Sequence, residues 1–277
     1  MLYFNNDSFY VELPQLSKKP TNSKDVVAGL GEIGLPIYQL ISKNCQTVGY
    51  DINPKLINKK LNQKYENLPT RFLHICIPFT KKFIPSVKSL YKKFEPQSIV
   101  IHSTIGPGIT IKIQKSLKIP VIYSATRGVH RRMLNDLKRY TKFFAITPNT
   151  PKSKSIANQY STLLKSCKVN TKKMSNPITL ELAKIVVDTS YYGWLINYAQ
   201  ISNMIAKKYG IDYDEMWSFS DEIQKYLGNR PKMFPGFIGG HCVIPNLALL
   251  GDNTLKIIKE INSDYAKILK KRKSRKK

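Results

Sequence analysis

The stretch that decides the fold is DVVAGLGEIG, residues 25–34. A short apolar run ends in glycine, and Gly29, Gly31 and Gly34 then form a G-x-G-x-x-G pattern that leads into the helical spacing of 32–43. In such a pattern the first glycine permits a tight turn, the second lets the backbone approach a pyrophosphate, and the third lets helix and strand pack closely. A helix N-terminus would face the phosphates with its partial positive charge. The stretch therefore predicts a dinucleotide-binding loop.

An acid at the end of the next apolar run points to the cofactor. The run QTVGYD ends at Asp51, 22 residues after Gly29. A carboxylate there accepts a hydrogen bond from the ribose 2′-hydroxyl and repels a 2′-phosphate, which favours NAD over NADP. Glu32 and Ile33 complete the predicted cofactor loop. The competing interpretation is three turn glycines and a solvated aspartate.

Strand-like and helical stretches alternate through the first half of the chain. Apolar runs of strand length are separated by helical patterns of 10–15 residues, which is typical of βαβ units around a parallel sheet. Buried parallel strands read as continuous apolar runs, as these do. We therefore predict an α/β fold, a doubly wound Rossmann sheet, with strands at 25–31, 46–51, 72–78, 98–104, 120–126 and 142–148.

The alternation stops after Asn149, and the second half reads as helical. Residues 175–210 predict one long helix with Ser175 or Asn176 as its cap, and 212–228 predict another. The predicted organisation is a leader (1–24), an NAD-binding Rossmann domain (25–172), an all-helical domain (173–265) and a basic tail (266–277).

The composition excludes several classes of protein. The 277 residues include four cysteines, none of them in a C-x-x-C pair, which argues against a disulfide framework or a metal site and favours a reducing compartment. We read no signal peptide at the N-terminus, and the longest apolar runs are too short to cross a bilayer. The expectation is a cytoplasmic protein that does not associate with a membrane.

The net charge of +27 predicts an anionic partner. Residues 267–277 hold eight of the basic residues and no acid. Such a tail can bind nucleic acid by neutralising phosphates. The alternative is a solvated, disordered end in a lysine-rich chain.

The order of the parts resembles the nucleotide-sugar dehydrogenases, over about residues 25–250. The resemblance is carried by GLGEIG, VGYDINP, CIPF, HSTIGPG, ELAKIVVDTSYYGWLINYAQ and FPGFIGGHC, of which GGHC is the most specific. The family oxidises a sugar CH₂OH to a carboxylate in two NAD-dependent steps, and a cysteine captures the intermediate aldehyde. The resemblance implies this activity, an anionic nucleotide-sugar substrate and a homodimer formed through the long helix.

The resemblance also implies roles for individual residues. Cys242 matches the nucleophile, and Lys184 matches the lysine that stabilises developing oxyanion charge. Thr104 matches a threonine of the active-site water network that also borders the cofactor. Pro78 and Ser103 match residues on the nicotinamide side. Taken alone, Cys242 also fits a small buried apolar residue.

Several positions depart from the family pattern. Asp188 stands four residues after the lysine where the family usually has asparagine, so Lys184 and Asp188 also fit a plain surface ion pair. Asn246 replaces an acid, and Thr126 and His130 replace two glutamates of the thioester and hydrolysis steps. His130 is predicted to act as a base near neutral pH.

The arginines of this loop and the length of the chain widen the range of functions. Arg127, Arg131 and Arg132 fit a phosphate or carboxylate site. The sequence ends where the family's third, nucleotide-binding domain begins. Two other functions therefore stay open. One is a β-hydroxyacid dehydrogenase acting on a small anionic alcohol. The other is a relative without catalysis that binds NAD and, through its basic tail, nucleic acid or another anion.

Overall fold

The described residues form two compact units. The computed structural model describes residues 22–147, 151–251 and 253–274. Most of the predicted leader and residues 275–277 of the predicted tail lie outside them. Unit 1 consists of 22–103 and 110–177, and unit 2 consists of 104–109 and 178 onward. Within the described residues, no helix combines the length and apolar character that a membrane span needs.

Unit 1 is built on a seven-stranded sheet with the order β2-β1-β3-β4-β5-β6-β7. The chain reverses its direction of travel across the sheet at β1, because β2 lies on one side of it and β3 on the other. In such sheets ligands bind outside the carboxyl ends of the strands at this switch point. The strands are β1 (Lys24–Ala28), β2 (Thr47–Tyr50), β3 (Thr70–Ile75), β4 (Ser98–Ile101), β5 (Val121–Tyr123), β6 (Lys142–Ile146) and β7 (Thr171–Lys173).

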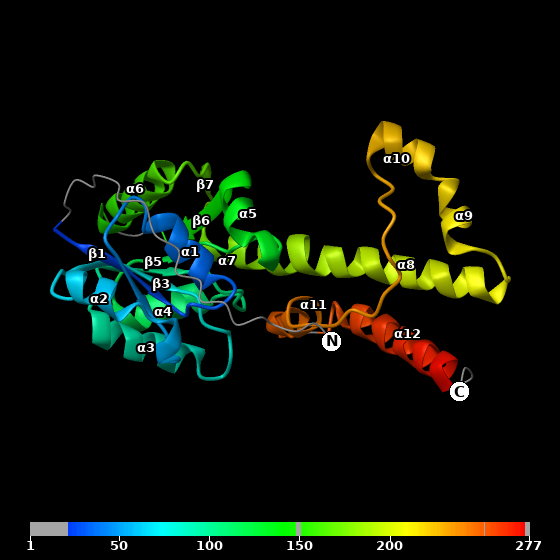
Figure 1. Ribbon diagram of the computed structural model, residues 1–277, viewed down its shortest axis with the longest axis horizontal. Helices are drawn as coiled ribbons and strands as arrows, with labels where there is room; N and C mark the ends of the chain where they lie inside the picture. Colours follow the sequence, from blue (N-terminus) through cyan, green and yellow to red (C-terminus); the bar gives the residue numbers. More distant parts are fainter. Residues whose placement is uncertain (1–21, 148–150, 252, 275–277) are drawn as a thin grey trace. The chain divides into compact units, whose positions relative to one another are not determined.

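Helices cover both faces of this sheet (Figure 1). On one face, apolar side chains of α1, α5 and α6 meet the strands in a single core, with Ile37, Leu137 and Tyr160 as one contributor from each helix. The other face carries α3 and α4. The helical segments of unit 1 are α1 (Gly34–Ile41), η1 (Pro54–Leu56), α2 (Lys59–Tyr65), α3 (Phe83–Phe94), α4 (Ile109–Leu117), η2 (His130–Arg132), α5 (Met133–Arg139) and α6 (Pro151–Ser166).

The predicted doubly wound Rossmann class is confirmed, with one departure from a fully parallel sheet. β6 runs antiparallel to β5, with Ile122 opposite Ile146, and β7 then runs parallel to β6. An antiparallel neighbour needs no crossover, so the chain between β5 and β6 leaves and re-enters the sheet at the same edge. That edge is the carboxyl end of β5, and the loop carrying His130 therefore stays beside the cofactor edge.

Unit 2 is helical, and its main helix changes character part-way. The predicted helix over 175–210 is found as α7 (Pro177–Leu182), a π-helical segment η3 (Ala183–Ser190) and α8 (Tyr191–Lys208), with helical backbone at both junctions. π-helical turns are rare and are frequently found at functional sites. The remaining helices are α9 (Tyr213–Ser218), α10 (Asp221–Leu227), α11 (Val243–Leu247), η4 (Ala248–Leu250) and α12 (Lys256–Ser274).

Two expectations for unit 2 change in detail. The predicted helix over 212–228 is divided into α9 and α10, which stand on the end of α8 in yellow and orange in Figure 1. Most of the predicted basic tail is the last part of α12, and α12 packs along α8. Residues 266–274 of the predicted tail therefore continue this helix.

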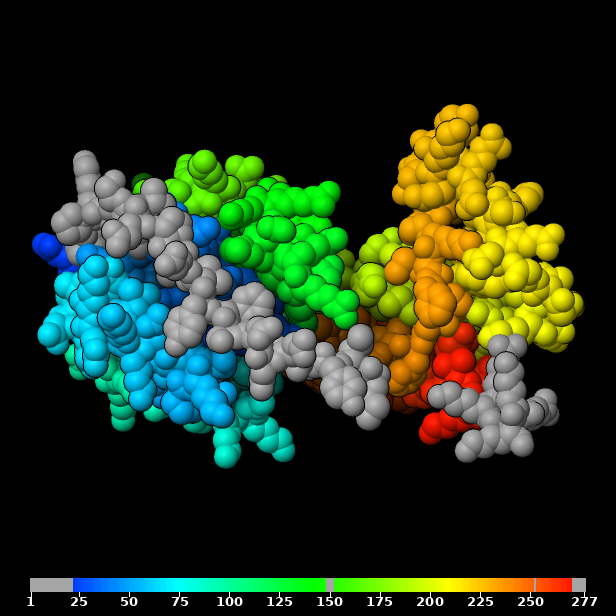
Figure 2. Space-filling model, viewed as in Figure 1, coloured from blue at the N-terminus to red at the C-terminus, as the bar shows by residue number. Residues whose placement is uncertain are grey.

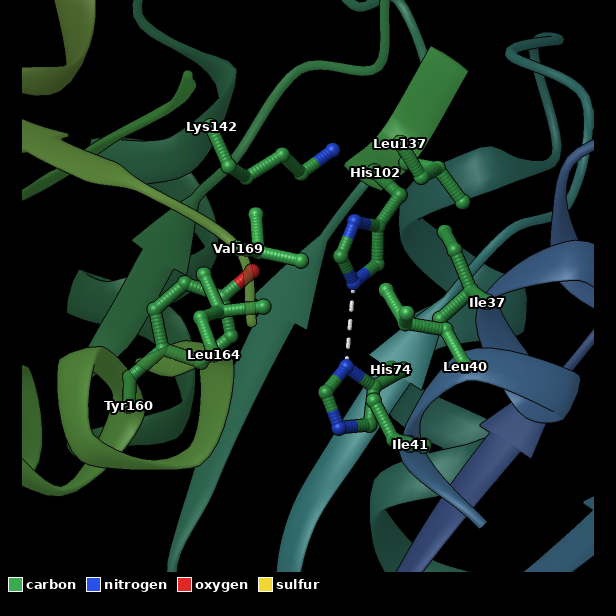
Figure 3. Close-up of a pocket in the computed structure, with 10 residues that line it drawn as sticks. All are labelled: Ile37, Leu40, Ile41, His74, His102, Leu137, Lys142, Tyr160, Leu164 and Val169. Atoms are coloured by element: carbon green, nitrogen blue, oxygen red, sulfur yellow. Dashed lines mark hydrogen bonds between the residues drawn. The ribbon is translucent and has the colours of Figure 1, made fainter. Parts of the chain in front are cut away.

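Two histidines are buried inside the core of unit 1. His74 on β3 and His102 after β4 are 1% and 4% exposed, and Nδ1 of His74 lies 3.0 Å from Nε2 of His102. The two rings stack with their planes 20° apart. Figure 3 shows the ammonium end of Lys142 beside the His102 ring, on the side away from His74. Burial lowers the pKa of His74 to about 4, and burial followed by the charge of Lys142 lowers the pKa of His102 well below its usual value.

The buried pair predicts acid sensitivity. Unfolded His74 has a pKa near 6.5, whereas the folded value is about 4. Between these values the unfolded chain binds a proton that the folded protein does not, so the free energy of unfolding falls as the pH drops. At about 1.4 kcal/mol per pKa unit, His74 alone accounts for a loss on the order of 3 kcal/mol.

Denaturant unfolding between about pH 7 and pH 4 measures this loss. His74→Gln should reduce the dependence of the free energy of unfolding on pH in that window, because one of the two buried imidazoles is gone while His102 remains. Equal slopes in the two proteins would contradict the prediction.

Candidate functional site

The glycine loop after β1 has the tight geometry that its sequence predicts. Gly29 adopts φ +90°, and a Cβ there would lie 2.8 Å from the carbonyl oxygen of Cys76. A Cβ on Gly34 would lie only 1.6 Å from the carbonyl oxygen of Gly29. Gly31 is different, because a Cβ there would meet nothing within 4 Å. The first and third glycines therefore hold strand and helix together, while the second faces open space.

The start of the helix that follows has no side-chain cap. Ile33 occupies the N-cap position of α1 and makes no side-chain capping bond. Leu35 N donates to the Gly31 carbonyl oxygen at 3.0 Å, and Pro36 has no N–H. Gly34 is therefore the first-turn residue whose amide can meet an anion. Open space at Gly31 and the Gly34 amide are the features that a bound pyrophosphate would use in this loop.

Asp51 directly follows β2 and forms a hydrogen bond to the backbone of the glycine loop. Its Oδ2 accepts a hydrogen bond from Leu30 N at 2.7 Å, and its Oδ1 accepts one from Asn53 N at 2.8 Å. A carboxylate can accept about four hydrogen bonds, so each oxygen keeps acceptor capacity for a ribose hydroxyl. The sequence predicted the ligand role of Asp51 but not its bond to the loop backbone.

The predicted nicotinamide-side residues follow the neighbouring strands. Pro78 is exposed just beyond β3, and Ser103 follows β4. The Ser103 hydroxyl donates to the carbonyl oxygen of Ile77 at 2.6 Å, which ties the ends of these two strands together. Both residues therefore lie at the carboxyl edge, with Gly29 and Asp51.

His130 reaches the glycine loop by an ion pair. Its Nδ1 lies 2.9 Å from Oε2 of Glu32, with His130 31% and Glu32 58% exposed. The sequence predicted Glu32 as a cofactor-loop residue and His130 as a base, but it gave no sign that they meet. In this arrangement Nδ1 faces the Glu32 carboxylate, so the pair links the loop after β5 to the glycine loop.

Asp136, a residue that the motif search missed, holds the loop that carries His130. Its Oδ2 accepts from Val129 N at 2.8 Å and from Arg132 Nε at 3.1 Å. These bonds, the one from the Val129 amide first, hold the pKa of Asp136 below its usual value. Gly128, at φ +140°, packs so closely that a Cβ would lie 2.7 Å from the Asp136 side chain. The available sequence signal was a lone acid among arginines and lysines.

The hydroxyl of Thr126, which stands where the resembled family has a glutamate, accepts a hydrogen bond from a buried lysine. Lys142 at the start of β6 is 6% exposed, and its Nζ donates to the Thr126 hydroxyl at 2.8 Å and to the Ala125 carbonyl at 3.0 Å. The sequence indicated nothing special about Lys142. A basic residue that opens an otherwise apolar strand was the available signal.

The π-helical segment of unit 2 carries the predicted lysine and its neighbour. Lys184 and Asp188 form an ion pair through Nζ and Oδ2, with 13% and 42% of their side chains exposed. The ammonium is thus well sheltered and neutralised by a more exposed carboxylate. The ion pair that the sequence allowed as an alternative is present, and the burial of Lys184 is deeper than a plain surface pair would have.

Cys242 is the exposed thiol among the four cysteines. Cys45 and Cys167 are buried in the core of unit 1, and burial raises the pKa of both. Burial also raises the pKa of Cys76 to about 12. Cys242 is exposed and directly precedes α11. The buried alternative for Cys242 is therefore wrong, since the surrounding turn leaves its side chain open to solvent.

The helix after Cys242 packs against the segment that carries Lys184. α11 contacts both the π-helical segment and α8. Gly193 makes this approach possible, because a Cβ there would lie 2.6 Å from Cγ1 of Val243. Asn246 lies one turn into α11, after the thiol. Unit 2 thus brings the elements of the predicted nucleophile and of the predicted oxyanion-stabilising lysine together.

The segment 104–109 joins the same unit and brings Thr104 with it. Gly108 N donates to Oε2 of the buried Glu181 at 2.6 Å, which anchors the segment to α7. Gly106 lies close to η4, the segment that follows α11. A Cβ on Gly106 would be 3.0 Å from the Leu249 carbonyl oxygen. Thr104 therefore belongs to unit 2 with Cys242 and Lys184, although it directly follows a strand of unit 1.

A buried amide network fixes the glycine turn before the thiol. Asn262 on α12 accepts from Ile238 N at 2.8 Å and donates to its carbonyl oxygen at 3.0 Å. Gln200 on α8 donates to the Gly236 carbonyl at 2.6 Å and to Asn262 Oδ1 at 3.1 Å. Two packed helices therefore hold the 236–238 backbone in place. Sequence reasoning missed both amides, because each lies far from the turn along the chain.

Solved structures share this fold. The UDP-D-ManNAc dehydrogenase of Pyrococcus horikoshii aligns with a TM-score of 0.72 and 21% identity, over 87% of this chain and 68% of that one. The UDP-N-acetyl-mannosamine dehydrogenase of Staphylococcus aureus gives 0.68 and 19%, over 91% and 70%. The 3-hydroxyisobutyrate dehydrogenase of Mycobacterium tuberculosis gives 0.62 and 14%, over 89% and 93%. The chain has the fold of these dehydrogenases.

Comparisons of sequence, in contrast to those of structure, gave no match. No family model matches the chain, and no curated protein sequence matches it. Identities of 14–21% to the structures establish the fold, and the function therefore rests on the site.

The glycine contacts predict opposite results for two substitutions. Gly34→Ala should destabilise the protein strongly, because its Cβ would lie 1.6 Å from a carbonyl oxygen that cannot move without opening the loop. Gly31→Ala should change the free energy of unfolding by less than about 0.5 kcal/mol, since its Cβ meets open space. Denaturant unfolding of the three proteins tests this pair, and comparable losses in both variants would refute it.

Proposed function

We propose that the protein is an NAD-dependent oxidoreductase that oxidises the primary alcohol of a nucleotide sugar to a carboxylate, through a covalent adduct on Cys242. The observation that carries the proposal is the arrangement within unit 2, where an exposed thiol precedes a helix packed on the segment of a sheltered lysine. A dinucleotide loop in unit 1 supports the redox part. Two UDP-sugar dehydrogenases are among the proteins of similar structure, which is consistent with the proposal.

The residues of unit 1 fit NAD. The uncapped start of α1 and the open space at Gly31 would take the pyrophosphate, and the free acceptor capacity of Asp51 would take a ribose hydroxyl. Pro78 and Ser103 would border the nicotinamide. The bound dinucleotide supplies a hydride acceptor for each of two oxidation steps. Asp51 carries a negative charge where NADP has its phosphate, so we propose NAD as the cofactor.

The thiol divides the second oxidation into feasible steps. After the alcohol has lost a hydride and a proton, the Cys242 sulfur adds to the aldehyde carbon and forms a thiohemiacetal. Loss of a second hydride and the hydroxyl proton gives a thioester. Water then breaks the C–S bond and yields a carboxylate and the free thiol. Overall, one alcohol, one water and two NAD⁺ give one carboxylate, two NADH and three protons.

Lys184 would stabilise the negative charge on the substrate oxygen. A sheltered ammonium interacts more strongly with such a charge than an exposed one, because water screens it less. Its partner Asp188 holds the amine in place through their ion pair. Thr104 would order the attacking water, and His130 would accept a proton during hydrolysis.

Two other functions compete with this one. A β-hydroxyacid dehydrogenase would use the same fold and a helix lysine without the thiol, and the alignment over 93% of the 3-hydroxyisobutyrate enzyme supports that reading. A protein that binds NAD without turnover would explain Thr126 and Asn246 in place of acids. Cofactor binding, turnover and the need for Cys242 separate the three.

The first test follows NADH absorbance with NAD and a panel of UDP- and GDP-sugars. We expect two NADH per sugar, and we expect Cys242→Ser to abolish carboxylate formation while NAD binding is kept. Full turnover by the Cys242→Ser variant would instead favour the hydroxyacid reading. NAD binding with no turnover on either sugars or small hydroxyacids would favour the protein without catalysis.

The exposed face of α8 supports a homodimer. Tyr191, Trp194, Tyr198 and Ile205 recur at helical spacing and are 42–57% exposed. A contiguous apolar stripe on a soluble protein marks an interaction site. We propose that a second copy covers it.

Mass measurement by light scattering tests the dimer. The protein should elute at twice the chain mass, and the pair Tyr191→Lys with Trp194→Lys should elute as a monomer, because charges are costly in an apolar interface. Leu56→Lys, which adds a charge at a similarly exposed apolar side chain of unit 1, should remain dimeric. A monomeric parent protein would overturn the assignment.

A further inference from the structure

Residues 96–180, nearly all in unit 1, carry an extreme positive charge. One acid, Asp136, stands among fifteen basic residues: Lys112, Lys115, Lys118, Arg127, Arg131, Arg132, Lys138, Arg139, Lys142, Lys152, Lys154, Lys165, Lys168, Lys172 and Lys173. Asp136 is 1% exposed, so its carboxylate contributes little to the surface. This charge belongs to unit 1 and is separate from the basic tail on α12.

Part of this charge is organised around two aromatic rings. The Arg127 guanidinium lies 5.0 Å from the ring centre of Phe143 and 5.8 Å from that of Tyr140. Lys172 lies 5.8 Å from the Phe143 ring, and Arg139 lies 5.9 Å from the Tyr140 ring. We call these five residues the Arg127 cluster. Its members come from the loop after β5, the end of α5, β6 and β7.

The Arg127 cluster lies on the face of the sheet turned away from α6. Phe144 packs on Tyr160 of α6 with ring centres 5.4 Å apart, and neighbouring side chains of a strand point to opposite faces. Phe143 therefore points away from α6, and Lys172 is its register partner on the edge strand β7. Phe143 is partly exposed, and Tyr140 is 38% exposed. In Figure 2 the helix α5, which borders this region, belongs to the green surface.

Within the described residues, the cations of the Arg127 cluster form no ion pair. Arg127 donates from Nη2 to the Thr141 carbonyl at 2.9 Å, which fixes its guanidinium. The acid of this stretch, Asp136, makes its salt bridge with Arg132. An ordered guanidinium loses little freedom when it binds a phosphate, and it presents several donors to the phosphate oxygens.

We propose that the Arg127 cluster binds single-stranded nucleic acid. Cations spaced along a sheet edge match a chain of phosphates, and the partly exposed rings of Tyr140 and Phe143 offer bases a surface on which to stack. A small anion would need one or two charges, whereas three cations grouped around two rings suit a polyanion.

Fluorescence anisotropy of a labelled thymidine oligonucleotide of about 20 residues tests the proposal with the full chain. Binding should weaken as salt rises. The triple variant Arg127→Gln, Arg139→Gln, Lys172→Gln should bind at least tenfold more weakly at low salt. The slope of log K against log salt should become shallower by about 2, at about 0.7 per lost phosphate contact.

A charge-matched control removes three lysines at the opposite edge of the sheet. Lys59, Lys60 and Lys64 lie exposed on α2, which packs on β2, and Lys64 sits 5.7 Å from the ring of Tyr65. Their replacement by glutamine should leave the affinity within about twofold. Equal losses in both triple variants would mean that net charge alone attracts the oligonucleotide, and they would overturn the assignment of the cluster.

Phe143→Leu separates stacking from charge. It keeps every cation and should weaken oligonucleotide binding about fivefold or more, with the salt slope unchanged. Removal of residues 267–277 should not abolish oligonucleotide binding, because the Arg127 cluster remains. Binding that vanishes on that deletion, or a protein that takes anionic lipid vesicles or polyphosphate but not the oligonucleotide, would overturn the proposal. Thermal unfolding confirms that each variant is folded.

Discussion

The close contact between the two ends of the glycine loop constrains the rest of unit 1. Gly34 approaches the Gly29 carbonyl so closely that no side chain fits between them, and this contact sets the angle at which α1 leaves β1. Asp51 then accepts from Leu30 N, which ties the end of β2 to the same loop. Gly31, between them, is left facing open space. The proposed site for a dinucleotide phosphate thus follows from one steric constraint and one hydrogen bond.

The same edge of the sheet gathers the other polar groups because of one reversal in strand direction. Since β6 is antiparallel to β5, the chain between them never crosses the sheet and its loop remains at the carboxyl edge. That loop brings His130 to Glu32, and the buried Asp136 and Lys142 fix its two ends. Buried charges of this kind are costly unless every donor and acceptor is satisfied, so they hold the loop in a defined conformation.

Unit 2 places its chemistry by helix packing. Cys242 lies in a turn that two buried amides, Gln200 and Asn262, secure to α8 and α12. The absence of a side chain at Gly193 lets α11 approach α8, and α11 also packs on the π-helical segment that carries Lys184. The proposed oxidation rests on this unit because it holds an exposed thiol, a sheltered ammonium and the π-helical segment η3.

The sequence by itself determined the Rossmann class, the glycine loop, the place of Asp51 and most helices and strands, because periodicity and turn glycines are local signals. It also paired Lys184 with Asp188, which are one helical turn apart. It did not determine the Glu32–His130 pair, the burial of Lys142 or the hold of Asn262 on Ile238. Each of these joins residues far apart in the chain, so only the packing of strands and helices could bring them together. The exposure of Cys242 and the antiparallel β6 were decided in the same way, since neither leaves a pattern in neighbouring residues.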